Sequence, residues 1–267
     1  MSIEPALAAL DETTFDSLRA TAGPWSPHAQ HAGPPAALLA RAMERHEPAP
    51  GTRLADVRLD ILGPIPVAPL TVDVELLRGG RSMQLLQATA STAGRPVAVA
   101  RAWRITRAPE DFPRLTGRRA EGIGAVPGAT DTSSRLELPG MHADGYVAVI
   151  EWRFVEGGVG TGGTATAWGR QLVPLLPDEE PSPWERTLVL ADSGGGITMT
   201  VDPRRHTYIN CDLHVVLDRD PEGEWVRMDS QAFATPGHGG TVRTTLADHH
   251  GVIGTGLQTM VAQDARC

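Results

Sequence analysis

Three polar residues of the C-terminal half, Asp192, Asn210 and Gln258, have side chains that could together activate a water molecule. Trp184, Leu188 and Asp192 recur every four residues, so in a helix they share one face, and the Trp and Leu make it the buried face. A partly buried aspartate can act as a general base. Amides both donate and accept hydrogen bonds, so Asn210 and Gln258 could orient the water. The simpler alternatives are a carboxylate that ends a helix and two amides satisfied by the backbone.

The elements that must position these residues occur twice along the chain. Each copy has a helix-like segment that opens at prolines, followed by three strands with glycine-bearing turns between them. The helices are predicted over 34–46 and 182–192, and the strands over 70–77, 83–91, 97–105, 225–235, 242–248 and 252–261. The repeat predicts a duplicated α+β fold. A segment rich in Pro, Gly and charge divides it into units over 1–108 and 146–267 with a linker over 109–145.

The two copies differ where the chemistry would lie. Aligning them on their strands places Gln258 opposite Trp103 and Asn210 opposite Leu54, and the first helix has Glu44 as its only acid, near its C-terminal end. One polar residue in an apolar strand means little, because such side chains are usually satisfied by the backbone. Three in the same half predict a polar pocket that the first half lacks.

The strand predicted over 206–217 presents a difficulty. Strict alternation puts Asn210 on one face with Tyr208, Asp212 and His214, opposite the apolar residues that would pack on the helix. Asn210 can then reach Asp192 only near the start of the strand, or where its face meets the junction of the two units.

Composition and motifs exclude other chemistries. All 24 basic residues are Arg, which excludes Schiff-base enzymes and P-loop NTPases because both need a lysine. The sequence has no GxSxG motif, and His28 and His31 occur without HExxH or CxxC, so we expect neither a serine nucleophile nor a metal. A formal net charge of −8 argues against nucleic-acid binding. No run of about 18 apolar residues could span a membrane and no basic segment starts the chain, so we expect a cytoplasmic protein.

Several segments resemble the acyl-CoA thioesterase II family and its actinobacterial relatives. They are HAGPPAALLARAM (31–43), DVRLDILGPIPVAPLTVDVELLRGGRSM (56–83), VAVARAW (97–103), WERTLVLADSGGGI (184–197), YINCDLHVVLDRDPEGEWV (208–226) and DHHGVIGTGLQTM (248–260). The resemblance covers most of the chain apart from the linker. It implies a double hotdog fold, in which two fused units each wrap a curved antiparallel sheet around a central helix.

The resemblance also implies a site and a reaction. In the family a helix Asp, a strand Thr and a late-strand Gln hold a water, and these positions fall on Asp192, Asn210 and Gln258, with Asn in place of Thr. The implied reaction is hydrolysis of an acyl-CoA thioester, with Asp192 as the base and without a metal or organic cofactor.

Two further groups complete the predicted site. Backbone N–H groups at a helix N-terminus can stabilise an oxyanion. Ala32 and Gly33 are the candidates because the two prolines that follow have no N–H, and a plain turn into the helix is the alternative. Arg78 and Arg81 are candidates to bind the phosphates of coenzyme A.

Two other functions are compatible with this fold. The chain could be a non-catalytic acyl-CoA-binding protein, which is the conclusion if Asp192, Asn210 and Gln258 do not converge. It could also be an enoyl-CoA hydratase, which would use an Asp–His pair; the segment DPRRH (202–206) offers both residue types at a different spacing. Exposed sheet edges leave room for a homo-oligomer of the pseudo-dimeric chain.

Overall fold

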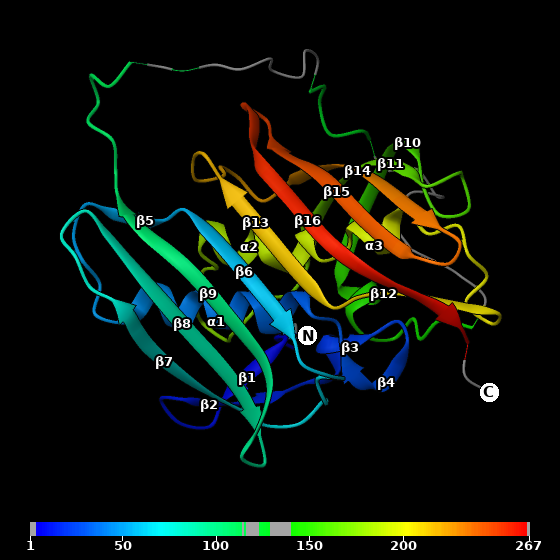
Figure 1. Ribbon diagram of the computed structural model, residues 1–267, viewed down its shortest axis with the longest axis horizontal. Coiled ribbons are helices and arrows are strands. Elements are labelled where there is room, and N and C mark those ends of the chain that lie inside the picture. Colours follow the sequence, from blue (N-terminus) through cyan, green and yellow to red (C-terminus); the bar gives the residue numbers. More distant parts are fainter. Residues whose placement is uncertain (1–3, 114, 116–122, 129–139, 266–267) are drawn as a thin grey trace.

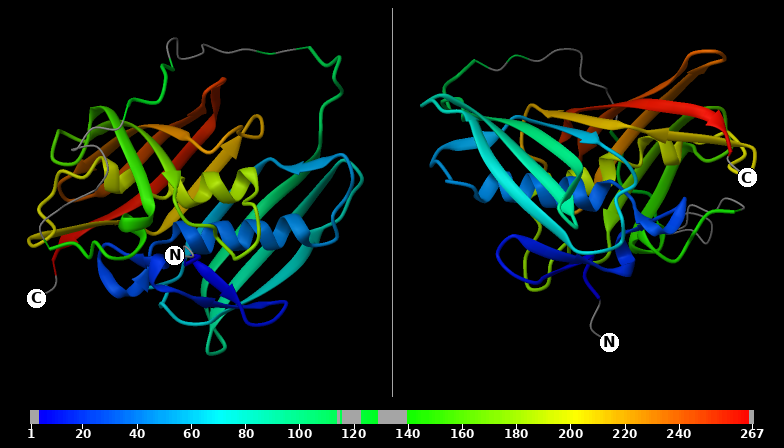
Figure 2. Two further views of the ribbon diagram at one scale, coloured as in Figure 1. Left: turned by 180° about the vertical axis from the view of Figure 1, so that it is seen from behind. Right: turned by 60° about the horizontal axis from the view of Figure 1, so that its bottom comes forward.

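Two central helices lie side by side against one large antiparallel sheet (Figures 1 and 2). The computed structural model describes residues 4–113, 115, 123–128 and 140–265. Seen from behind the sheet, α1 (Gly33–Arg45) and α2 (Pro183–Ala191) are neighbours on its concave side. Among the described residues, no helix is both long and apolar enough to cross a membrane.

The N-terminal unit forms around α1. Pro34 and Pro35 stand in its first turn, where a missing N–H costs nothing, and the side chains of Leu38, Leu39 and Met43 are fully buried against the sheet. Across the sheet the strands follow the order β1 (Leu7–Ala9), β2 (Thr14–Ser17), β7 (Leu70–Arg78), β8 (Met83–Thr92), β9 (Arg95–Thr106) and β6 (Asp56–Ile61), and β5 (Thr52–Leu54) pairs with β9. The 3-10 helix η1 (Arg19–Thr21) and the short strands β3 (Ala22–Gly23) and β4 (Ser26–Gln30) precede α1.

The C-terminal unit repeats this plan around α2. Ser182 caps the helix by accepting a hydrogen bond of 3.2 Å from the Glu185 N–H. Across the sheet the strands follow the order β13 (Asp212–Leu217), β16 (Gly251–Asp264), β15 (Gly239–Asp248), β14 (Val226–Thr235), β11 (Thr164–Gln171) and β10 (Ile150–Gly157), and β12 (His206–Asn210) pairs with β16. The 3-10 helix η2 (Tyr146–Val149) opens the unit. The glycines after Asp192 form a short helix, α3 (Gly194–Ile197).

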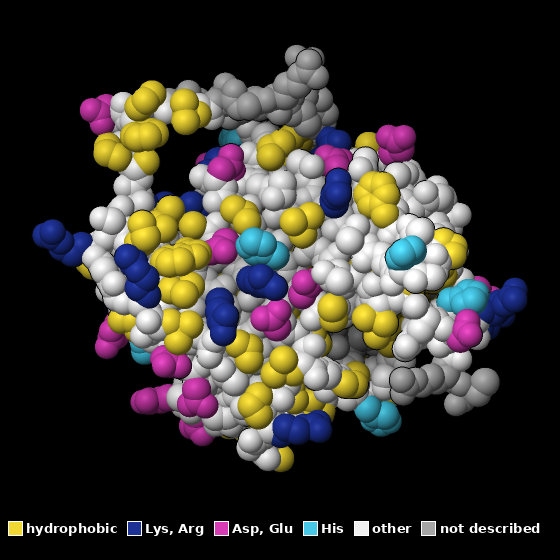
Figure 3. Space-filling model, viewed as in Figure 1, with side chains coloured by type: hydrophobic (Ala, Val, Ile, Leu, Met, Phe, Trp, Pro, Cys, Tyr) yellow, Lys and Arg dark blue, Asp and Glu magenta, His cyan; other side chains and the backbone are white. Residues whose placement is uncertain are grey.

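The two units join through β6 and β13, which pair antiparallel at the centre of the sheet (Figure 1). Arg58 faces His214 in this pair, and the inward residues Leu59 and Leu213 face each other and are buried. The units are therefore related by an approximate two-fold axis, and the predicted duplication is confirmed. Figure 3 views the outward face of the sheet, where hydrophobic, basic and acidic side chains are mixed.

A break in the strand predicted over 206–217 removes the difficulty with Asn210. Asn210 pairs with Met260, whereas His214 pairs with Leu257, so the register shifts by one residue at Cys211. One extra residue in a strand exchanges its two faces, as in a β-bulge. The expectation of strict alternation through this segment was wrong.

The bulge lets polar and apolar residues share the inner face. Tyr208, before it, is 6% exposed, and Leu213 and Val215, after it, are buried as well. The Asp212 carboxylate fixes the bulge by accepting hydrogen bonds from the N–H (2.6 Å) and hydroxyl (3.0 Å) of Thr259. Asn210 thus faces the helices.

The same register defines which residues of the two units are equivalent. Leu54 pairs with Arg104 on β9 as Asn210 pairs with Met260 on β16. Leu54 is therefore the counterpart of Asn210, as the sequence alignment indicated. Gln258 stands two residues before Met260, so its counterpart is Ala102, two residues before Arg104, and not Trp103. The alignment was off by one residue here.

Candidate active site

Asp192 lies at the centre of a buried polar cluster. It is the C-cap of α2 and only 6% exposed. Its Oδ1 accepts hydrogen bonds from Nδ2 of Asn210 (2.7 Å) and Nε2 of Gln258 (3.4 Å). Its Oδ2 lies 3.2 Å from Nδ1 of His31, which belongs to the N-terminal unit. Asn210 and Gln258, both predicted from sequence, therefore contact Asp192 directly. His31, which was not predicted, contacts it as well.

Gln258 is fixed at both ends of its amide. Besides Oδ1, its Nε2 donates to the backbone carbonyl of Asp192 at 3.0 Å, and its Oε1 accepts from the Gly195 N–H at 3.2 Å. The backbone must approach closely here, because a Cβ on Gly194 would lie 2.8 Å from that Oε1 and 2.9 Å from the Thr244 hydroxyl. Gln258 therefore ties β16 to both the end of α2 and the start of α3.

Asn210 reaches Asp192 from the other side. Its Nδ2 also donates to the carbonyl of Asp212 at 3.0 Å, across the bulge that turns the side chain inward. In this arrangement the amide nitrogens of Asn210 and Gln258 point at the carboxylate itself. Their geometry is suited to holding the carboxylate in one orientation, because Oδ1 is tied to side chains from two different strands, β12 and β16.

His31 is the residue that sequence reasoning missed. Its ring stacks on Tyr146, with ring centroids 3.6 Å apart and planes 2° from parallel. The Tyr146 hydroxyl donates to the Val189 carbonyl at 2.7 Å and lies 2.7 Å from the Ser193 hydroxyl. Burial lowers the pKa of His31, an effect that the charge of Asp192 opposes, and burial raises the pKa of Tyr146. The ring is thus held next to Asp192 and favours its neutral form.

A pocket with a volume of about 810 Å³ opens onto this cluster. That volume is in the range of small-molecule sites, about 300–1,000 Å³. His31, Asp192 and Asn210 all line it, and so do residues of both units. Its apolar walls are built by Pro24, Trp25, Ile61, Pro64, Ile65, Ile209, Met260 and Val261.

The start of α1 offers one free backbone donor to this pocket. Ala32 lines the pocket, and its N–H has no hydrogen-bond partner among the residues that the structure describes. The Gly33 N–H instead points at Nδ1 of His31, 3.1 Å away. A Cβ on Gly33 would collide with the Val189 carbonyl, so the glycine lets the ends of the two helices meet. Of the two predicted oxyanion donors, Ala32 is the one at the pocket.

Both halves of the sequence match one family of enzymes. Residues 21–105 match the acyl-CoA thioesterase N-terminal domain, and residues 109–262 match the acyl-CoA thioesterase C-terminal domain. The chain belongs to the acyl-CoA thioesterase family. It is accordingly a thioester hydrolase. No protein of curated function matches it.

Solved structures share the fold over nearly the whole chain. A protein with a hot dog fold from Alicyclobacillus acidocaldarius is 18% identical with a TM-score of 0.71, covering 97% of this chain and 96% of its own. A tesB protein from Mycobacterium avium subs paratuberculosis is 15% identical with a TM-score of 0.68 and 96% coverage of both chains. Acyl-CoA thioesterase II TesB2 from Mycobacterium marinum is 14% identical with a TM-score of 0.64, covering 97% and 94%. The predicted double hotdog fold is confirmed.

The two arginines suggested for coenzyme A lie away from the pocket of this thioesterase. Arg78 ends β7 and Arg81 lies in the turn to β8, and Arg78 donates to the Met83 carbonyl at 3.2 Å. Met83 pairs with Ile105 near the C-terminal end of β9, whereas Ile61 of the pocket wall pairs with Ala98 near its beginning. Neither arginine lines the pocket, and their role stays a prediction.

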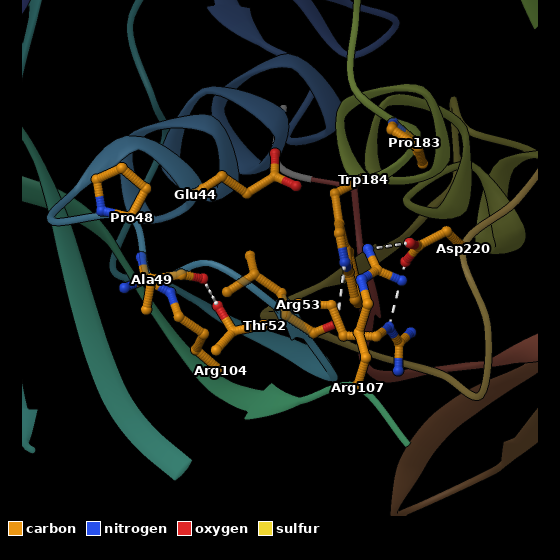
Figure 4. A pocket seen from close by; sticks show the side chains of 11 residues that line it. Glu44, Pro48, Ala49, Thr52, Arg53, Arg104, Arg107, Pro183, Trp184 and Asp220 are labelled. Carbon is orange, nitrogen blue, oxygen red and sulfur yellow. Dashed lines mark hydrogen bonds and ion pairs between the residues drawn. The ribbon is translucent and has the colours of Figure 1, made fainter. Parts of the chain in front are cut away.

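The two-fold axis relates the active-site pocket to a second, smaller one of about 260 Å³ (Figure 4). Glu44, near the end of α1, accepts a hydrogen bond of 2.7 Å from the Ser182 hydroxyl at the start of α2, much as Asp192 meets His31. Leu54 takes the place of Asn210 in its wall. Arg53, Arg104 and Arg107 also line this pocket (Figure 4). Arg53 and Arg107 both form ion pairs with Asp220. The amide-supported carboxylate is therefore built only in the C-terminal half of the described chain.

Proposed function

We propose that this thioesterase hydrolyses acyl-CoA with a water molecule that the Asp192 cluster activates. The observation that carries the proposal is the Asp192 carboxylate itself. It is buried, it accepts hydrogen bonds from two amides, it contacts a histidine, and it lies on the wall of a large, mostly apolar pocket. A carboxylate so placed can supply the negative charge that draws a proton from water, an effect of about 100- to 10,000-fold on the rate.

The pocket can hold the substrate in the required orientation. The acyl chain would lie along the apolar wall, with the thioester carbonyl oxygen directed at the free N–H of Ala32. One such donor contributes about 100- to 1,000-fold to acyl transfer. The water oxygen attacks the carbonyl carbon, its proton passes to the cluster, and the tetrahedral oxyanion collapses. The sulfur of coenzyme A leaves with the returned proton, which yields a carboxylic acid and a free thiol.

Free-thiol release from acyl-CoAs of rising chain length tests the proposal, with wild type and Asp192→Asn measured side by side. We expect turnover by the wild type, and a loss of at least about 1,000-fold in Asp192→Asn with acyl-CoA binding within a few-fold. Glu44→Gln changes the equivalent carboxylate of the second pocket and should leave turnover unchanged. Binding without any wild-type turnover would instead indicate an acyl-CoA-binding protein.

The Asp192–His31 contact also favours a second candidate, hydration of an enoyl-CoA. An Asp–His pair is the arrangement expected of a hydratase on this fold, and the structure forms one at 3.2 Å from residues far apart in the sequence. A short trans-2-enoyl-CoA separates the two reactions. Hydration removes the absorbance of the conjugated thioester without releasing thiol, whereas hydrolysis releases one thiol for each substrate consumed.

A further inference from the structure

We infer that the pantetheine arm of coenzyme A binds along the free edge of strand β12, with one of its amides paired to the backbone of Tyr208 and its phosphates directed at Arg205. The inference rests on the proposed function and concerns the part of the pocket that holds the coenzyme. It differs from the sequence-based expectation, in which Arg78 and Arg81 bind the phosphates.

One edge of β12 has no strand beside it. Among the described strands, β12 pairs only with β16. On its other side β6 ends at Ile61, whose N–H donates to the Cys211 carbonyl at 2.9 Å, and β12 extends past that end (Figure 1). The consecutive residues 207–211 all line the active-site pocket. Because side chains alternate between the two faces of a strand, this unbroken run indicates that the pocket follows the edge of β12.

The hydrogen bonds to β16 show which backbone groups point at the free edge. The Cys211 N–H donates to the Thr259 carbonyl at 3.0 Å, and the Arg205 carbonyl accepts from the N–H that follows β16 at 2.9 Å. In an antiparallel pair, residues bonded to the neighbouring strand alternate with residues that are not. Tyr208 and Asn210 are therefore of the second kind. Their backbone N–H and carbonyl groups have no hydrogen-bond partner in the part of the chain that the structure describes.

The equivalent edge of the N-terminal unit is closed by the chain itself. Leu54, the counterpart of Asn210, has its carbonyl bonded to the indole Nε1 of Trp184 at 3.2 Å. Thr52, two residues earlier, donates its N–H to the Ala49 carbonyl at 3.3 Å. The two units thus share the strand, but only the unit that carries the Asp192 cluster leaves its edge open to a ligand.

The pantetheine arm has the groups that such an edge binds. It is an extended chain with two amides, and a short carbon spacer separates the first amide from the thioester sulfur. Along the strand, Tyr208 lies two residues, about 7 Å, from Asn210. When the thioester lies beside Asp192, which Asn210 contacts, the first amide falls at Tyr208. Backbone hydrogen bonds between an extended chain and a sheet edge provide affinity in peptide recognition, and an amide of the arm can form the same bonds.

Arg205 lies at the far end of this edge. It directly precedes β12, between Pro203 and Thr207, which both line the pocket. The turn that carries it is fixed, because the Asp202 carbonyl accepts from the Arg205 N–H at 2.9 Å. Arg204 holds the Asp202 carboxylate at 2.9 Å, whereas the exposed Arg205 side chain forms no ion pair with any described residue. The turn therefore has one guanidinium more than it has carboxylates, which suits a phosphate.

Amide hydrogen exchange of the wild type tests the backbone pairing without a variant. The Tyr208 amide has no partner in the free protein and should exchange rapidly, and saturating coenzyme A should slow its exchange at least about 10-fold. Saturating pantetheine should do the same, because it carries the amides. The Ile209 amide, which pairs with β16, is the matched control and should exchange slowly throughout. A Tyr208 amide whose exchange neither ligand slows would overturn the inference.

Thiol release from an acyl-CoA and from the matching acyl-pantetheine tests the phosphate contact. In Arg205→Ala the KM for acyl-CoA should rise about 3- to 10-fold with kcat unchanged, because one exposed charge-assisted contact is lost. The KM for acyl-pantetheine, which lacks the phosphates, should stay within about two-fold. Arg81→Ala, which also removes an exposed arginine, is the matched control and should change neither KM.

Two kinetic results would also overturn the inference. One is an Arg205→Ala enzyme whose KM is unchanged for both substrates or raised equally for both. The other is a rise in the KM for acyl-CoA alone in Arg81→Ala. Absence of thiol release by the wild type would be a separate failure, of the proposed function itself, and hydrogen exchange with coenzyme A would still decide where the arm binds.

Discussion

Leu54 and Asn210 occupy equivalent positions in the two units, each paired with the corresponding residue of the neighbouring strand. The backbone is the same, but only Asn210 places a donor 2.7 Å from a carboxylate. The side chain at this position thus decides whether it is a wall residue, as in the second pocket, or a partner of the Asp192 carboxylate.

Replacing Asn210 by the residue of the other unit tests this relationship. In Asn210→Leu the Asp192 carboxylate loses a charge-assisted hydrogen bond worth about 1.5–3 kcal/mol, so kcat/KM for thiol release should fall about 10- to 100-fold. The reciprocal variant Leu54→Asn should leave turnover unchanged. It should lower the free energy of unfolding by about 1–3 kcal/mol, because the variant buries an amide without providing a hydrogen-bond partner for it. Equal activity of Asn210→Leu and wild type would remove Asn210 from the mechanism.

Tyr146 has two separable contributions, its hydroxyl and its ring. In Tyr146→Phe the Val189 carbonyl loses its donor while the stack on His31 remains, so the free energy of unfolding should fall by about 1–3 kcal/mol and kcat should stay within a few-fold. Tyr146→Ala also removes the ring, and kcat should then fall more than about 10-fold because His31 is no longer held in place. Denaturant unfolding and thiol release measure the two effects. Similar kcat values for both variants would show that the stack does not position His31.

The Gly194 backbone must pass close to Gln258. In Gly194→Ala the new Cβ would stand 2.8 Å from Oε1 of Gln258, so the amide must move away from Gly195 and Asp192. We expect a destabilisation of about 1–3 kcal/mol and a fall in kcat. In Gly196→Ala the Cβ would meet nothing within 4 Å, so unfolding should change by less than about 1 kcal/mol. If both variants have the same thermal stability, the close approach of the Gly194 backbone to Gln258 does not require a glycine there.

Much of the fold and part of the site could be predicted from periodicity and the internal repeat. The repeat located both helices and the paired strands, and three polar residues in apolar surroundings located Asp192, Asn210 and Gln258. The bulge at Cys211 could not be predicted, because alternation counts residues and one unpaired residue exchanges the two faces. This is also why the face of Asn210 was assigned wrongly.

His31 was missed for a different reason. It lies in the other unit, and its role depends on two helix ends that meet only after the units pack together. Within its own half, a histidine before a helix that starts with prolines carries no chemical signal. The contact could have been anticipated by applying the two-fold symmetry to the helices, because the segment before α1 then lies opposite the C-terminal end of α2. By the same axis, Ser182 faces Glu44 in the second pocket.

Glu185 makes stability depend on pH at the start of α2. The side chain is 4% exposed, and burial raises its pKa to about 7, an effect that the Ser182 backbone N–H opposes. The pKa in the folded protein lies above the usual value of 4.5, so this contribution to stability is complete below pH 4.5 and is lost as the pH rises through about 7. Glu185→Gln resembles the protonated acid and does not titrate. At pH 8 it should therefore raise the free energy of unfolding by about 2–3 kcal/mol, with little change near pH 4. Urea unfolding across this range, with the exposed Glu110→Gln as control, measures the difference; a gain of the same size at every pH would mean that the variant acts through packing and not through the proton.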